Sequence, residues 1–126
     1  MAKELIYEQE SFQIIGACFE VYKEKGAGFT EPNYQECLEI ELTLRGIPFQ
    51  PQPEVNMQYK GRTLVKTFRR DFIVFGKIIV EIKALSALCD EHRAQIQNYL
   101  NATGMHLGLL VNFGHFPKTE FERYAN

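Results

Sequence analysis

Apolar residues recur at helical spacing in three parts of the chain. From Glu8 to about Lys25 they form two adjacent stripes, which predict a broadly buried helix. The stripes are Phe12, Ile15, Phe19 and Tyr22, and beside them Ile14, Cys18 and Val21. A second helix is expected from about Thr30 to Arg45 and a third from about Asp90 to Ala102. A glycine follows each segment, as is typical where a helix ends.

The remaining apolar segments are shorter and predict strands. Three prolines between positions 48 and 53 restrict that segment to an edge strand or a loop. Strands are expected over Val55–Tyr59, about Thr63–Phe75 and Lys77–Lys83, forming an antiparallel meander, and the second is long enough to need a bend or bulge. The apolar run Leu107–Phe113 predicts a buried last strand before a short polar tail. The element order is therefore helix, helix, three strands, helix, strand, which is an α/β (α+β) pattern.

Length and composition restrict the class of protein further. A chain of 126 residues, with 45% hydrophobic and 13% aromatic content, fits one compact domain over residues 1–126. The apolar runs are too short to cross a membrane, and the first residues lack the apolar stretch of a secretion signal. Three scattered cysteines fit reduced thiols better than a disulfide framework. We therefore expect a cytoplasmic protein with no membrane partner.

Charged residues interrupt two of the predicted core strands. Asp71 lies in the second strand, and Glu81 and Lys83 lie in the third. Because strand side chains alternate between faces, Glu81 and Lys83 share a face with Ile79. The short connection at Gly76 would close a hairpin and could bring Asp71 opposite the Glu81 region.

Two converging carboxylates repel each other unless a proton or a cation separates them. Mg²⁺ suits such a site, because it binds oxygen ligands and usually takes one or two carboxylates. Lys83 would orient or deprotonate an attacking water, so the pattern suggests a single-metal phosphodiesterase. The alternative is a surface strand of alternating charges, because Glu-x-Lys triplets are common by chance.

A basic cluster precedes Asp71 in a chain whose net charge is −2. It consists of Lys60, Arg62, Lys66, Arg69 and Arg70. The net charge argues against an overall basic coat, so any contact with a polyanion must come from local clustering of this kind. The cluster is equally compatible with a phosphate-contacting face and with a solvated edge hairpin.

The element order, with an aspartate on the second strand and Glu-x-Lys on the third, resembles the PD-(D/E)XK nuclease superfamily. Gly28-Phe29-Thr30-Glu31-Pro32-Asn33-Tyr34 is similar to the motif of the family called GxxExxY proteins. Other similar segments span most of the chain: Arg70-Asp71-Phe72, Val80-Glu81-Ile82-Lys83-Ala84, His92-Arg93-Ala94-Gln95, Asn98-Tyr99-Leu100 and Gly108-Leu109-Leu110-Val111-Asn112-Phe113-Gly114. The chain departs from the superfamily pattern at Arg70, where a proline is expected.

This resemblance implies a restriction-endonuclease-like αβββαβ core with a mixed central sheet flanked by helices. It implies Asp71, Glu81 and the Ile82 carbonyl as metal ligands and Lys83 as the catalytic lysine. Glu31 would be the first-helix acid, at the metal directly or through water, although an acid is also favourable at any helix start. Gln95 would face the site; its alternative is an exposed helix residue. Tyr34 and Tyr99 are expected to be structural supports.

The sequence thus favours a nuclease that uses Mg²⁺ or Mn²⁺, with one metal and a lysine-assisted water attack on a phosphodiester. Lys66, Arg69 and Arg70 are expected to contact the nucleic acid, with DNA expected rather than RNA. The alternative is a non-catalytic nuclease-fold module that binds nucleic acid or a protein partner, since one small domain offers little substrate grip. A homodimer, which would extend the grip, remains open.

Overall fold

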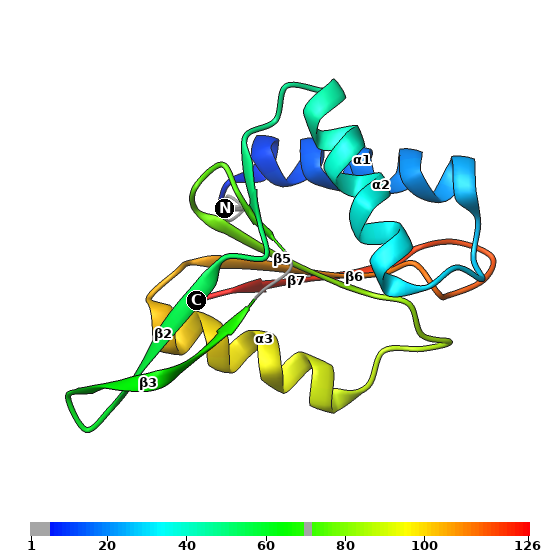
Figure 1. Cartoon of the computed structure of the whole chain (residues 1–126). Coiled ribbons are helices and arrows are strands. Elements are labelled where there is room, and N and C mark those ends of the chain that lie inside the picture. Colours follow the sequence, from blue (N-terminus) through cyan, green and yellow to red (C-terminus); the bar gives the residue numbers. More distant parts are fainter. Residues whose placement is uncertain (1–5, 70–71) are drawn as a thin grey trace, which may run out of the picture.

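The structure is a computed structural model that describes residues 6–69 and 72–126 (Figure 1). Over these residues the chain forms helices and strands in an order close to the predicted one. The helices are α1 (Glu8–Lys25), α2 (Glu31–Leu44) and α3 (Asp90–Thr103). The strands are β1 (Phe49–Pro51), β2 (Glu54–Tyr59), β3 (Arg62–Arg69), β4 (Phe72–Val74), β5 (Ile78–Lys83), β6 (Leu107–Asn112) and β7 (Glu120–Ala125).

A five-stranded mixed sheet forms the centre of the fold, in the order β1-β4-β5-β6-β7. Strands β5 and β6 are parallel and are connected through α3, whereas the other neighbours in the sheet are antiparallel. Helices α1 and α2 cover one face of the sheet and α3 covers the other (Figure 1). The predicted α+β class, with a mixed sheet between helices, is confirmed.

Strand β5 lies at the middle of this sheet, and its side chains alternate between the two layers. Val80 and Ile82 are buried in the cluster formed with α1 and α2, whereas Ile79 packs against Tyr99 and Leu100 of α3. This alternation is the predicted one. It assigns Glu81 to the same side of β5 as Ile79, the side on which α3 lies.

Helix α1 is less buried than its two apolar stripes suggested. The stripe that contains Ile14, Cys18 and Val21 is buried in the core. In contrast, Phe12 is 80% exposed and Phe19 is 47% exposed, so the prediction of a broadly buried helix was wrong. A helix on the outside of a sheet buries only one side. In the second stripe, Ile15 and Tyr22 still pack against the core, whereas Phe12 and Phe19 lie on the exposed side.

The predicted strand over Thr63–Phe75 is divided between two sheets, so the expected three-stranded meander was also wrong. Among the residues that the structure describes, its first part, β3, pairs only with β2 in a separate hairpin, and its last part, β4, lies between β1 and β5. Where the two ladders meet they share one register, because Pro51 pairs with Phe72 and Glu54 pairs with Arg69. The segment is therefore a single ribbon divided between two sheets, and the register shift opposite Asn56 and Gln58 confirms the predicted need for a bend or bulge.

The bend of the ribbon has a local cause between β1 and β2. Gln52 has a φ of 43°, a left-handed value that interrupts an extended strand. Pro53, next in the chain, has no N–H to donate to a ladder. As predicted from the prolines, this segment supplies only an edge strand, β1. The inner half of the ribbon then stays in the central sheet, while the outer half leaves it.

The polar tail forms an unpredicted edge strand, β7, antiparallel to β6. Charged residues are tolerated there because an edge strand has one open side. Arg93 of α3 donates two hydrogen bonds to the Glu122 carboxylate, at 2.8 and 2.9 Å, and joins the helix to this edge. These bonds lower the pKa of Glu122.

None of the described helices is long and apolar enough to span a membrane.

Candidate active site

Glu81 is the most unusual residue of the central sheet. Its side chain is only 3% exposed, although its strand is otherwise apolar and its partner in β6 is Leu110. Burial of a carboxylate is costly unless hydrogen bonds or a nearby cation compensate for the lost hydration. Lys83, two residues further along the same strand, is half-buried. Because an acid is seldom fully buried unless it has a partner, Glu81 with Lys83 two residues away is a candidate functional pair.

Asp71 and Arg70 lie outside the described residues, but their neighbours are placed. Phe72, which follows Asp71, is buried and pairs with Val80, which precedes Glu81. The predicted hairpin between the two strands is present, closed by Phe75 and Gly76, both with positive φ values. Strand β4 therefore begins beside the part of β5 that carries Glu81.

Glu31 occupies the first position of α2 and is half-buried. The turn before it is held by Tyr34, whose hydroxyl donates to the Gly26 carbonyl and accepts a hydrogen bond from the Phe29 N–H. The Tyr34 ring is fully buried and stacks on Phe113, with 4.7 Å between ring centroids. Tyr34 thus has the structural role predicted for it, and it fixes the start of the helix that carries Glu31.

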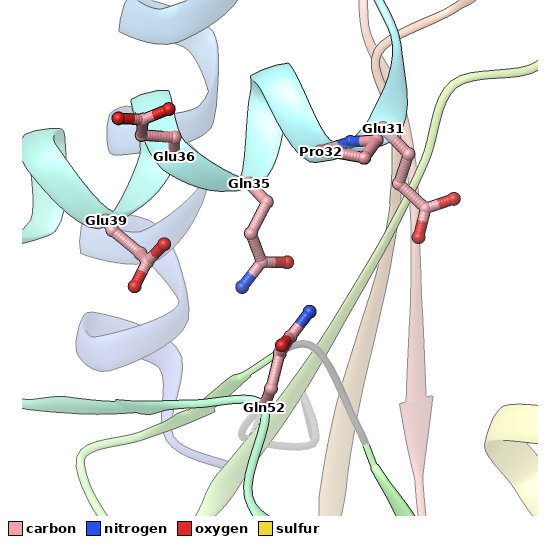
Figure 2. A pocket seen from close by; sticks show the side chains of 6 residues that line it. All are labelled: Glu31, Pro32, Gln35, Glu36, Glu39 and Gln52. Atoms are coloured by element: carbon pink, nitrogen blue, oxygen red, sulfur yellow. The ribbon is translucent and has the colours of Figure 1, made fainter.

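A cavity of about 540 Å³ opens along one side of α2, from the first residue of the helix, Glu31, as far as Glu39. It is lined by Glu31, Pro32, Gln35, Glu36, Glu39 and Gln52. In Figure 2, Gln35 of α2 and Gln52 of the ribbon's bend point toward each other, and Glu36 points away from both. The cavity therefore joins the first turns of α2 to the bend of the ribbon at Gln52.

Asn112, at the end of β6, fixes the segment that follows Lys83. Its Oδ1 atom accepts hydrogen bonds from the N–H groups of Leu85, at 2.9 Å, and Gly114, at 3.1 Å. Its Nδ2 atom donates to the Leu85 carbonyl, at 2.9 Å, and to the Glu120 carboxylate, at 3.0 Å. Asn112 is fully buried, and both sides of its amide are used. One side chain thereby holds the exit of β5 against β6 and the start of β7.

Gly114 allows the segment that follows Lys83 to lie close to the end of β6. A Cβ atom at this position would lie 2.3 Å from the Leu85 nitrogen and 2.6 Å from the Ala84 carbonyl carbon. Both contacts are with backbone, which cannot rotate away as a side chain can. The Lys83 carbonyl also accepts a hydrogen bond from the Phe113 N–H at 2.8 Å. Residues 112–114 therefore set the position of the chain directly after the Glu-x-Lys pair.

The sequence had not singled out Asn112 or Gly114 as site residues. The available signal was a polar residue at the end of the apolar run Leu107–Phe113, followed by a glycine. A fully buried amide at such a position must find hydrogen-bond partners, and here they are backbone groups of a neighbouring loop.

The other residues predicted for the site lie on several different elements. Gln95 is exposed on α3, one residue before the buried Ile96. The Ile82 side chain is buried on the opposite face of β5 from Glu81. A contact of Ile82 with a metal would therefore have to come from its backbone carbonyl, as predicted. Lys66 and Arg69 belong to β3, upstream of the bend.

The chemistry of the donor set fits a small, hard cation. The predicted ligands Asp71 and Glu81 would supply carboxylate oxygens, which Mg²⁺ and Mn²⁺ prefer. Within residues 6–69 and 72–126, no group of three or more His, Cys, Asp or Glu side chains is arranged to hold a metal ion. The predicted ligand Asp71 lies outside this range.

Comparison with known proteins identifies the class. The family model of the PD-(D/E)XK nuclease superfamily matches residues 8–124, which is nearly the whole chain. The chain therefore belongs to the PD-(D/E)XK nuclease superfamily.

Among solved structures, the one titled "Crystal structure of SSO0001" resembles this fold, with a TM-score of 0.59 and 17% sequence identity. The match covers 95% of this chain and 57% of that one, so the chain spans little more than half the length of that protein. A likeness at this identity concerns the fold alone. No curated protein matches the chain.

Proposed function

We propose that the protein is a nuclease that hydrolyses phosphodiester bonds of nucleic acid with the help of Mg²⁺ or Mn²⁺. The observation that carries the proposal is the burial of Glu81 in the middle strand of the sheet, two residues before Lys83. Phe72, which follows Asp71 in the chain, pairs with Val80, which precedes Glu81. Membership of the nuclease superfamily supports the same conclusion.

In this proposal Asp71, Glu81 and the Ile82 carbonyl bind the metal ion, and Glu31 contributes from the start of α2, directly or through water. A divalent cation bound there would polarise the scissile phosphate and lower the pKa of the attacking water. Glu81 is fixed by its strand, and this rigidity reduces the reorganisation needed to form the site. Gln95 would contribute from α3 if the helix or its side chain turns toward the substrate.

Lys83 is proposed to hold the attacking water and to accept its proton or balance the charge that develops on the phosphate. The rigid exit of β5 supports this role, because Asn112 and Gly114 hold the residues that follow Lys83. Displacement of a reacting group by about 1 Å can lower the rate of the reaction by about two orders of magnitude. Lys66, Arg69 and Arg70 would contact phosphates of the substrate upstream of Asp71.

Cleavage of labelled single-stranded and double-stranded DNA and RNA, with Mg²⁺ or Mn²⁺, tests this function. We expect cleavage that EDTA abolishes and that the Asp71→Ala variant lacks. Absence of cleavage on every substrate with either metal would contradict the enzymatic proposal, and so would activity that survives Asp71→Ala unchanged.

A second function, that of a non-catalytic module on the nuclease fold, is favoured by the charge of the chain. A net charge of −2 gives little general attraction for nucleic acid. Such a module would bind nucleic acid or a protein partner without hydrolysis. It differs from the nuclease in a measurable way, because it would show neither metal-dependent cleavage nor binding of a divalent metal that depends on Asp71 and Glu81.

A further inference from the structure

The hairpin of β2 and β3 stands outside the central sheet, and we call residues 54–69 the arm. The two strands pair only with each other among the described residues, and Figure 1 shows the turn of the arm projecting beyond the sheet. Every residue from Gln58 to Val65 is exposed. The turn is formed by Lys60 and Gly61, both with positive φ values, so the predicted turn is confirmed. The arm is thus an extension that contributes little to the core.

The charge of the arm is opposite to that of the rest of the chain. It contains Lys60, Arg62, Lys66 and Arg69 against a single acid, Glu54, and so carries +3. The whole chain carries −2, which leaves −5 on the remaining residues. An acidic body with one basic projection attracts a polyanion to the projection and repels it elsewhere. This asymmetry argues that the arm, and not the general surface, contacts nucleic acid.

The end of the arm also presents apolar side chains between its cations. Val65 is 98% exposed, Tyr59 is 62% exposed and Leu64 is 42% exposed. The Lys60 amine lies 5.5 Å from the centroid of the Tyr59 ring. Cations would suit phosphates, and apolar groups suit sugars, thymine methyl groups and base edges. The combination fits the inside of a nucleic-acid groove better than the outside of a phosphate backbone.

We propose that the arm enters the major groove of double-stranded DNA and places the duplex at the catalytic strands. This inference rests on the proposed nuclease function and names its substrate. A two-stranded β-ribbon fits the major groove of B-form DNA. The major groove of A-form RNA is too narrow and deep for it, so duplex RNA would be a poor ligand. With six residues in β2, the arm is about 20 Å long, enough to reach the floor of a groove about 8.5 Å deep.

The position of the arm agrees with this role. Arm and catalytic strand belong to one ribbon, because the register of β2 and β3 continues into that of β1 and β4. Arg69, the last residue of β3, is two positions before Asp71 in the chain. A duplex held by the arm would therefore be close to the candidate metal ligands.

Binding of labelled duplex DNA, duplex RNA and single-stranded DNA, measured by fluorescence anisotropy in EDTA, tests this proposal. Wild-type protein is expected to prefer duplex DNA. The Lys60→Ala/Arg62→Ala variant should bind it about tenfold or more weakly, and the slope of log affinity against log salt should become shallower by about two. The control Lys23→Ala/Lys118→Ala removes two exposed lysines outside the arm and should bind like wild type. Circular dichroism and thermal unfolding establish that both variants are folded.

Several results would overturn the proposal. One is an equal loss of affinity for duplex DNA in the control variant, and another is unchanged affinity in the arm variant. A third is a wild-type protein that prefers duplex RNA or single-stranded DNA. A change of oligomeric state in the arm variant, by sedimentation, with unchanged DNA affinity would make the arm a protein interface instead. Because binding is measured without metal, a failure of the catalytic proposal, seen as duplex binding without cleavage, is distinguishable from a failure of this one.

Discussion

Replacement of Lys83 by alanine is expected to lower the rate of metal-dependent cleavage by about 10²- to 10⁴-fold, the usual contribution of a group that moves a proton in the transition state. The fold should be unaffected, because Lys83 is half-buried at the end of its strand and its backbone, not its side chain, accepts the bond from Phe113. Metal affinity should stay near that of wild type. Single-turnover cleavage, with thermal unfolding of the same preparations, measures both effects.

Lys77→Ala is a matched control at the other end of β5. Lys77 lies 2.7 Å from the Glu10 carboxylate in a partly exposed ion pair, which contributes little to stability because water and salt screen it. Its removal should leave cleavage unchanged. If Lys83→Ala and Lys77→Ala reduce cleavage equally, or if Lys83→Ala cleaves at the wild-type rate, Lys83 has no catalytic role.

Gly114→Ala is expected to have the largest effect on stability, with a loss of about 1–3 kcal/mol or more in the free energy of unfolding. The added methyl group would lie within 2.6 Å of backbone atoms of Ala84 and Leu85, so one of the two chain segments has to move. That movement would also disturb the hydrogen bonds of Asn112 and the position of Lys83. Cleavage should therefore fall even at temperatures at which the variant is folded. Urea unfolding and single-turnover kinetics measure the two effects.

Gly16→Ala provides a comparison in which the same chemical change meets a flexible neighbour. A Cβ at Gly16 would lie 3.3 Å from the end of the Arg45 side chain, and alanine favours the helical conformation of α1. Its stability should stay within about 1 kcal/mol of wild type. A Gly114→Ala variant as stable and as active as Gly16→Ala would show that the close approach to Leu85 is not needed.

The parts of the fold that follow from local periodicity could be predicted from the sequence. The core side of α1, the hairpin into β5 and the alternation along β5 depend on spacings of two or three to four residues, which the sequence displays directly. The division of the long strand between two sheets could not be predicted. It depends on which neighbour each half finds in space, since both halves have the same extended pattern and continue one register.

For the site, the sequence predicted the unusual charges but not what supports them. Glu81 and Lys83 stand out because they interrupt an apolar strand. Asn112 does not, because an asparagine at the end of a strand is typical of an ordinary turn. Its role arises from contact with Leu85, 27 residues away, which only the parallel pairing of β5 with β6 produces. Similarly, the exposed position of Gln95 depends on the rotation of α3 against the sheet.

The central claim is that Glu81 and Asp71 together hold a divalent cation. Titration with Mn²⁺ or Mg²⁺ in a calorimeter tests it most directly, with wild type, Glu81→Gln, Asp71→Ala and, as a control, Glu36→Ala, which removes an exposed acid of the α2 cavity. We expect wild type and Glu36→Ala to bind the metal alike. Glu81→Gln and Asp71→Ala should each bind it at least 10- to 100-fold more weakly, about the loss that follows removal of groups that merely support a ligand. Wild-type affinity in Glu81→Gln and Asp71→Ala, or a wild-type protein that binds neither metal, would contradict the account.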